Sequence, residues 1–318
     1  MLLSMKPGSR FHYDRDLPVS AKKLRFALVL LYLFAISATP TQAADSPVSD
    51  EAKAACCRYE GADLAQLHKS ADRLYSQFKP REAVAELLKI LHADGNNFEA
   101  LVKLARAHID IGDLLPENGA NWQERKLKEY TIAQDYARKA MRIDPNSTWS
   151  HFWIAAAVGS IAVVSPMSKQ VDLSIEIRDE VEKSIALDPK NGSAYHVYGV
   201  WHRKVAEIGG ASRMFASMLY GKSLPKGSLE KSIEYLKKAV ALNPTVIVSR
   251  LELARSHAAK SEWPAARALL KSIPELPAQF SDDAKHKQNA AQLLEEIKER
   301  YPRRQSRRYP LRTVALPT

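Results

Sequence analysis

The chain has 318 residues, of which 46% are hydrophobic and 26% are charged, values that match globular proteins and exclude wholesale disorder. Its 12 glycines and 17 prolines exclude collagen and low-complexity sequences, and its two cysteines exclude a disulfide scaffold or an all-cysteine zinc site. The net charge of +11 gathers at the ends, since residues 1–25 carry +4, residues 298–312 carry +6 and the remainder carries only +1. A folded nucleic-acid-binding domain would be basic on one face, so we expect no specific nucleic-acid partner.

The first predicted element is a leader with a signal peptide at residues 1–43. Two lysines and an arginine at positions 22–25 precede a thirteen-residue apolar run at residues 26–38, and small residues near its end fit cleavage after Ala43. The pattern predicts export to the periplasm or outside the cell. The run is shorter than the about 20 residues that usually cross a bilayer. An uncleaved anchor at residues 26–38 with a cytoplasmic body is therefore the alternative, and an organelle presequence is a third interpretation.

A linker at residues 44–60 follows and contains the adjacent Cys56 and Cys57. Both lie too far beyond the apolar run for a lipoprotein cleavage site, and neighbouring cysteines rarely bridge each other. From residue 61 to residue 300 the sequence predicts helix after helix. No stretch there alternates apolar and polar residues for long enough to indicate a strand.

Self-similarity organises this helical region, residues 61–300. Residues 139–145, 183–189 and 238–244 each run from a lysine to a proline and end an amphipathic helix, and residues 89–95 form a degenerate fourth copy. An aliphatic residue stands two positions before each proline. The Asp or Asn between them is expected to cap the following helix, whose first turn tolerates the proline.

A second kind of helix follows three of these copies. It spans residues 98–108, 192–202 and 247–257, and in each case a small residue follows a large one. The pairs are Leu104-Ala105, Tyr198-Gly199 and Leu253-Ala254. A small side chain at this position lets two helices approach closely. The histidine that ends each copy is expected to pack between the paired helices.

These features resemble the tetratricopeptide repeat over about residues 62–275. The resemblance implies an all-α fold, a right-handed superhelix of antiparallel helix pairs, A and B. The closing positions are 50, 44 and 55 residues apart, whereas that family's unit has 34, so we expect insertions between helices A and B. The expected insertions are residues 113–123, 163–171 and 207–227.

The order of the copies resembles the regulator of microtubule dynamics proteins. The matching series comprises Leu-Leu-Pro at 114–116, Ile-Asp-Pro-Asn at 143–146, Leu-Asp-Pro-Lys at 187–190 and Ala-Tyr-His-Val-Tyr-Gly-Val-Trp at 194–201. The resemblance implies a protein-interaction scaffold whose animal members bind microtubules, so tubulin is a partner by resemblance alone. If the chain is an exported bacterial protein, the resemblance carries the fold and not the partner. The alternative function is then a role in envelope assembly or secretion.

The sequence has no motif typical of catalysis, metal binding or cofactor binding, so we expect no catalytic residue, metal or cofactor. The nine histidines form no His-Glu-x-x-His or other close metal pair. Gly221-Lys222-Ser223 lacks the earlier glycine and the preceding strand of a phosphate-binding loop. An enzyme or cofactor pocket beneath residues 207–227 is the least favoured alternative.

The concave side of the superhelix, which helix A lines, is the remaining candidate for function. The expected partner-binding groove comprises Arg106, Asp110, Trp149, Phe152, His196 and Arg255. Arg106 and Arg255 hold equivalent repeat positions and are expected to pair with a carboxylate of an extended peptide. The alternative is that Trp149 and Phe152 pack against residues 163–171 and fill the groove.

Two elements close the chain. Residues 281–300 predict a helix with one apolar stripe, the solvating cap that repeat arrays need. Residues 301–318 predict a basic disordered tail, which either contacts an anionic surface (lipid, nucleic acid or acidic protein) or only aids solubility.

Overall fold

The part of the chain whose structure can be described begins just after the expected linker. The computed structural model describes residues 63–210, 213–214, 218 and 225–300. These belong to the second of two units, Met1–Ala54 and Ala55–Thr318. The expected signal peptide, linker and basic tail lie outside the described residues, at 1–43, 44–60 and 301–318.

The described ranges contain eleven α-helices and no strand, as the sequence predicts. In chain order the helices are α3 (Leu64–Ser76), α4 (Pro80–Ala93), α5 (Phe98–Leu114), α6 (Trp122–Ile143), α7 (Thr148–Val164), α8 (Met167–Leu187), α9 (Gly192–Ala206), α11 (Leu229–Leu242), α12 (Ile247–Ala259), α13 (Trp263–Ser272) and α14 (Asp283–Arg300). No helix in these ranges is long and apolar enough to cross a membrane.

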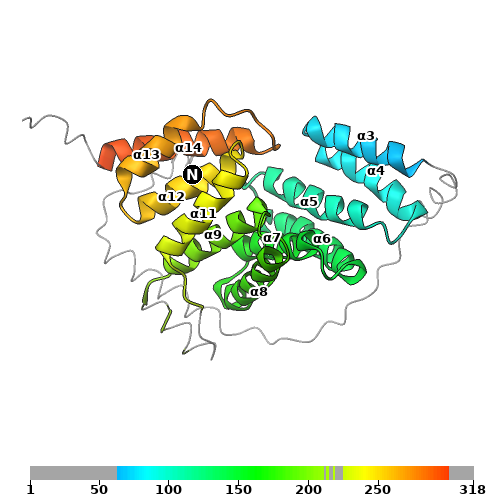
Figure 1. The fold of residues 1–318 in the computed structure, drawn as a ribbon, viewed down its shortest axis with the longest axis horizontal. Helices are drawn as coiled ribbons and strands as arrows, with labels where there is room; N and C mark the ends of the chain where they lie inside the picture. The colour runs from blue at the N-terminus through cyan, green and yellow to red at the C-terminus, as the bar shows by residue number, and fades with distance from the viewer. Residues whose placement is uncertain (1–62, 211–212, 215–217, 219–224, 301–318) are drawn as a thin grey trace, which may run out of the picture. The chain divides into compact units, whose positions relative to one another are not determined.

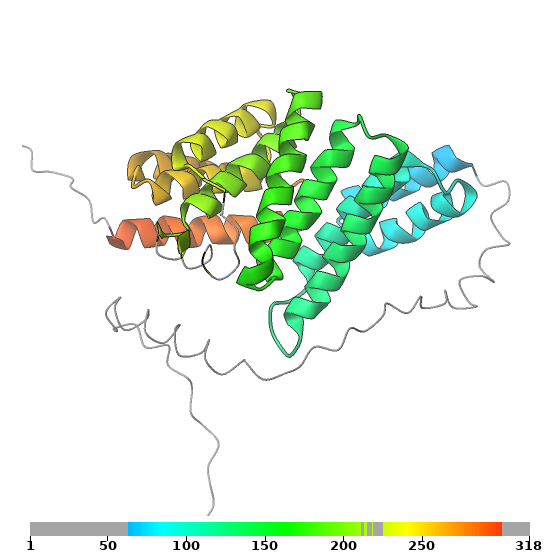
Figure 2. The ribbon, with the colours of Figure 1, turned by 90° about the horizontal axis from the view of Figure 1, so that it is seen from below.

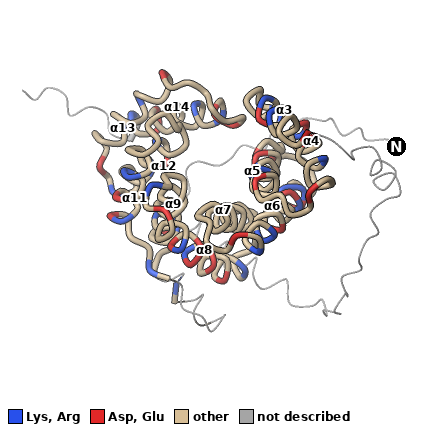
Figure 3. Tube along the Cα trace, turned by 45° about the vertical axis from the view of Figure 1, so that its right-hand side comes forward, with Lys and Arg blue, Asp and Glu red and all other residues tan. Residues whose placement is uncertain are grey.

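The helices pack as successive antiparallel pairs, from α3/α4 to α12/α13, with α14 at the end (Figure 1, Figure 2). The first helix of each pair is helix A (α3, α5, α7, α9 and α12), and the second is helix B. Figure 3 shows the A helices on the inner side of the array and the B helices on the outer side. Contacts from α5 to α7, from α7 to α9 and from α9 to α12 make the inner side continuous. This arrangement confirms the all-α helical-repeat fold.

The turns between pairs differ from the expected caps. Asp144 does not cap the next helix, because its carboxylate accepts a hydrogen bond from the Asn146 backbone N–H at 3.0 Å, and Asp188 repeats this contact one pair later. Each aspartate opens a turn whose second residue is the proline, a position that the fixed φ of proline favours. The helix caps come after the turn. Asn191, for example, accepts from the Ala194 N–H at 3.1 Å.

The first expected insertion, residues 113–123, is mostly a connection, since residues 115–121 lie between two helices, whereas the second, residues 163–171, is mostly helix. The first A helix concerned, α5, continues to Leu114 before α6 begins at Trp122, and α7 continues to Val164 before α8 begins at Met167. The extra residues lengthen the B helices, so α6 has 22 residues and α8 has 21. The prediction of an insertion at 163–171 is therefore wrong, because α7 and α8 together contain all of these residues except Ser165 and Pro166. The third expected insertion lies only partly within the described residues.

Small residues allow the close packing that the repeat pattern predicts. A Cβ atom on Gly199 of α9 would lie 2.5 Å from Leu236 Cγ of α11, and Ala105 of α5 is fully buried. The central core includes Trp201, whose Nε1–H donates to the Ser174 carbonyl at 2.8 Å. Side chains from α5 to α9 share this core, so the middle pairs form one continuous support for the inner face.

Candidate functional site

The inner face of α7 carries a stripe of side chains that solvent can reach. Its members recur at intervals of three and four residues, the spacing of one helix face. They are Trp149, Trp153, Ala156, Ser160 and Val163. The exposed fraction is 43% for Trp149 and 79% for Val163, which lie at opposite ends of the helix. The stripe offers aromatic and apolar surface over about 20 Å of helix.

Phe152, expected in the groove, packs in the core instead. Its side chain is 7% exposed and belongs to the central core with Val158. The reason is the helical rotation of about 100° per residue, which places Trp153 rather than Phe152 on the stripe of Trp149. Residues 163–171 follow the opposite end of α7, so they do not cover Trp149 as the alternative interpretation required.

The chain itself crosses the inner side between α13 and α14. The crossing segment, residues 274–286, comprises this connection and the first turn of α14, and it reaches α5 and the loop after it. The Phe280 ring centroid lies 5.3 Å from Arg106 Cζ, and Lys285 Nζ lies 3.2 Å from Glu117 Oε1. Asp283, which is 0% exposed, shapes the segment because its Oδ2 accepts the N–H groups of residues 279 and 280 at 2.7 and 2.9 Å. Besides ending the array, α14 therefore connects the C-terminal end of the array to the α5/α6 pair.

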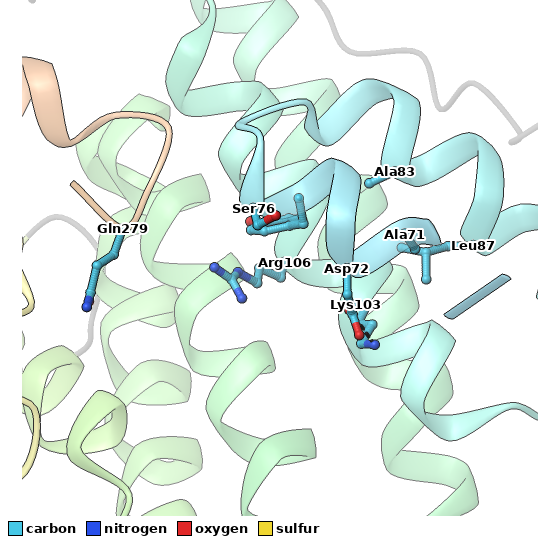
Figure 4. Close-up of a pocket in the computed structure, with 9 residues that line it drawn as sticks. Ala71, Asp72, Ser76, Ala83, Leu87, Lys103, Arg106 and Gln279 are labelled. Carbon is cyan, nitrogen blue, oxygen red and sulfur yellow. Dashed lines mark ion pairs between the residues drawn. The ribbon is translucent and has the colours of Figure 1, made fainter. Parts of the chain in front are cut away.

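Two cavities flank the crossing segment where it meets α5. The first, of about 280 Å³, lies between α3, α5 and Gln279 (Figure 4). The second, of about 380 Å³, is lined by α5, α6, α7 and the start of α14, and Phe280 contributes to its wall. This part of the inner side therefore has two pockets where the sequence analysis expected a groove.

Arg106 occupies the first cavity without a counter-charge of its own. Its Cζ lies 3.9 Å from the Tyr75 ring centroid and 5.3 Å from that of Phe280. Burial lowers the pKa of Arg106 to about 10, against the opposing charge of Asp72. Asp72 itself pairs with Lys103, at 2.6 Å between Oδ1 and Nζ. Figure 4 shows the guanidinium pointing into the space between the end of α3 and Gln279.

Arg255 lies in a different setting from Arg106, despite their equivalent repeat positions. Its guanidinium pairs with Glu252 on the same helix, and Glu252 also pairs with the buried Arg203 of α9. A third cavity, of about 250 Å³, is lined by Arg255, by Trp263 and by the C-terminal part of α14. The two arginines therefore do not form the expected pair of free cations, because Glu252 neutralises Arg255.

Asp110 and His196 are brought together in the second cavity. The Oδ2 atom of Asp110 is buried and has no hydrogen-bond partner. Burial, followed by the charges of Asp113 and Asp282, raises the pKa of Asp110 well above its ordinary value. His196 Nδ1 lies 3.1 Å from Ser249 Oγ, and burial lowers the pKa of His196 to about 4, which keeps its ring neutral near pH 7. The cavity thus holds buried carboxyl groups that repel one another.

Replacing Asp110 with asparagine is expected to stabilise the fold near neutral pH, because a folded-state pKa above the ordinary value means that ionisation of Asp110 costs stability. The folded pKa of Asp110 lies above its ordinary value of 3.8, so its favourable contribution is present below pH 3.8 and is lost as the pH rises through the folded pKa. Asparagine cannot ionise and avoids that loss. Thermal unfolding at neutral and acidic pH measures the difference, with exposed Asp135→Asn as the control. A destabilised Asp110→Asn protein at neutral pH would contradict this account.

The histidine that ends each helix A copy packs as expected. His108 Nδ1 lies 2.8 Å from Glu129 Oε2 on α6, and the His202 ring stacks on Tyr235 of α11 with 5.5 Å between centroids. His257 is 6% exposed. These rings join paired helices. Among the described residues, no three His, Cys, Asp or Glu side chains gather as a metal site would require.

The paired helices and the continuous inner face of the A helices define a tetratricopeptide-repeat protein. A thermophilic tetratricopeptide-repeat protein from Thermus thermophilus shares this fold, with a TM-score of 0.52. The two are 14% identical, and the match covers 72% of this chain and all of the other. At this identity the likeness concerns the fold alone.

The family described as Regulator of microtubule dynamics protein 1-3 matches residues 67–298. Regulator of microtubule dynamics protein 1 of Bos taurus is 25% identical over 73% of this chain and 71% of its own length. The Caenorhabditis elegans protein of the same name is 28% identical over 54% of this chain and 76% of its own length. The chain therefore belongs to the regulator of microtubule dynamics protein 1-3 family. These relatives are named as regulators and not as enzymes.

Proposed function

We propose that the chain is a non-catalytic interaction scaffold that binds a peptide or protein segment on its inner face. One observation carries the proposal: Arg106 and Asp110, one helical turn apart on α5, line adjoining cavities and each lacks a hydrogen-bonded partner of opposite charge in the described residues. Buried charges without partners are unfavourable in the isolated protein. A partner that supplies the missing charges gains affinity from relieving that cost.

The stripe on α7 supports the same proposal. Trp149, at the N-terminal end of this stripe, is an aromatic side chain left half-exposed, and aromatic residues are enriched among the side chains that dominate binding energies. Ser160 and Val163 of the stripe line the second cavity together with Asp110. The stripe would hold the apolar part of a partner while the cavities beside it select charge.

The compartment decides which partner is available. The pattern at residues 1–43 favours export, in which case the partner is a protein of the cell envelope, whereas an uncleaved anchor at 26–38 leaves the body in the cytoplasm. Tubulin is then the partner that the names of the relatives suggest. The mass of the mature protein and its cellular fraction separate the two. A soluble exported species that begins near Ala44 removes microtubules from the proposal.

Ser160→Trp tests the inner face directly, since an indole there fills the second cavity. Short peptides selected from a random display library on the full-length protein are expected to lose at least about tenfold in affinity, or 1.4 kcal/mol. Ala186→Trp adds the same side chain at an exposed position of α8 and is expected to change little. Fluorescence anisotropy measures both. Equal effects of the two variants would refute binding on the inner face.

A further inference from the structure

We infer that the cavity around Arg106 is a binding site for the carboxylate of an acidic side chain on the partner. The inference deepens the proposed function and rests on it for the identity of the ligand as a peptide. It is carried by three features of the cavity: how the guanidinium is held, which charges surround it, and how the cavity opens.

The guanidinium is held by ring contacts that leave its hydrogen-bonding edge available. Tyr75 lies 3.9 Å and Phe280 lies 5.3 Å from Arg106 Cζ, both within the about 6 Å over which a cation and an aromatic ring attract. Contacts of this kind occupy the guanidinium faces and leave the N–H groups, which are directed at the edge. That edge is the fork that binds a carboxylate through two parallel hydrogen bonds.

The surrounding charges favour a ligand with a single negative charge. Three charged residues line the cavity, namely Asp72, Lys103 and Arg106. Lys103 Nζ already contacts the carboxylates of Asp72 at 2.6 Å and Glu99 at 2.7 Å. Lys103 is therefore already paired, and Arg106 is the cation of the lining that has no ion pair among the described residues. A carboxylate neutralises it, whereas a phosphate dianion would bring a second charge close to Asp72.

The cavity opens to solvent, so a side chain can enter from outside. Asp72 and Ser76 on α3 and Gln279 on the crossing segment are exposed and form its rim (Figure 4). Its volume of about 280 Å³ is ample for the end of an aspartate or glutamate side chain. Since Phe280 belongs to the crossing segment, this segment completes the site as well as dividing the inner face.

The first test uses small probes on the full-length protein, followed by NMR or calorimetric titration. N-acetylglutamate amide is expected to bind weakly, and its isosteric glutamine analogue is expected not to bind. Arg106→Gln should weaken binding of the glutamate probe at least tenfold, and Arg106→Lys, which keeps the charge but loses the fork, should weaken it by less. The control is Arg138→Gln, because Arg138 already pairs with Glu176 at 2.5 Å between α6 and α8.

Equal binding of the two probes, or no effect of Arg106→Gln, would overturn the inference. Tighter binding of inorganic phosphate than of the glutamate probe would overturn it too. Thermal unfolding establishes that each variant is folded. Tyr75→Leu supplies an independent variant, because it removes one ring contact but keeps the arginine. It is expected to weaken binding of the glutamate probe.

The peptides selected on the protein separate this inference from the proposed function. Selected peptides enriched in Asp or Glu, with affinity lost in Arg106→Gln, support both. Peptides that bind the inner face without acidic enrichment overturn the carboxylate site and leave the scaffold intact. If the glutamate probe binds at Arg106 but no peptide is selected, the site takes a free carboxylate compound, and both the acidic-peptide inference and the peptide scaffold are wrong.

Discussion

Replacing Glu252 with glutamine is expected to lower the free energy of unfolding by about 3–5 kcal/mol, the cost of breaking a buried ion pair by removing one partner. Glu252 is 6% exposed and pairs with Arg203, which is 5% exposed, and with Arg255. The neutral amide leaves the Arg255 guanidinium without its counter-charge and leaves the buried Arg203 with only the more exposed Glu207 as a partner. Urea unfolding of the wild-type and variant proteins measures the loss.

The pH dependence of the same variant has a definite sign. Burial alone would raise the pKa of Glu252, but the charges of Arg203 and Arg255 hold it below the ordinary value of 4.5. The stabilisation is therefore fully present above pH 4.5 and is lost as the pH falls through the lower folded pKa. The difference in free energy of unfolding between the wild-type and Glu252→Gln proteins should therefore become smaller in that acidic range.

The control for Glu252 is Glu234→Gln on α11. Glu234 pairs with Lys238 at 2.9 Å, but the side chains are 57% and 48% exposed, and such surface pairs contribute about 0–1 kcal/mol. An equally small effect of Glu252→Gln would show that Glu252 does not hold α9 to α12 as described.

Replacing Trp201 with alanine is expected to destabilise the protein by about 3–5 kcal/mol, the range for truncating a buried tryptophan. Trp201 is 5% exposed, lies in the central core and donates from Nε1 to the carbonyl of Ser174. The variant loses this packing, creates a cavity and removes the hydrogen bond from the indole to the carbonyl of Ser174. Because α5 to α9 share this core, the loss should appear as a lower midpoint of unfolding.

Trp149→Ala is the matched comparison, since Trp149 is 43% exposed. Its cost in stability is expected to stay below about 1 kcal/mol, in the range of surface substitutions plus a small loss of packing on Phe152. The variant should instead weaken binding of selected peptides. A Trp149→Ala protein as unstable as Trp201→Ala would place Trp149 in the core and remove it from the inner face.

The fold was largely predictable because each repeat contains the small residues and turn motifs that determine how its two helices pack. The small residue at Gly199 lies where α11 approaches α9, and the repeated Asp-Pro turns mark where pairs end. The length of the connections was less predictable. Extra residues can extend a helix or form a loop, and the sequence pattern at 163–171 did not distinguish the two.

The candidate site was only partly predictable. Arg106 and Asp110 followed from the repeat register, but the choice of Phe152 over Trp153 turned on a single residue of helical rotation. The ion pair of Arg255 could have been predicted from the sequence, because Glu252 lies three positions earlier on the same helix. The contact of Phe280 with α5 could not have been predicted in this way, because it joins distant parts of the sequence and Phe280 lies outside the repeat.

The most direct test of the scaffold proposal is to map where a selected peptide contacts the full-length protein. A peptide with a photoreactive group, crosslinked and located by mass spectrometry, is predicted to label the inner faces of α5 and α7, around Arg106 and Trp153. Labelling should fall in the Ser160→Trp protein. Crosslinks confined to the outer helices α6, α8 and α11 would contradict a binding site on the inner face.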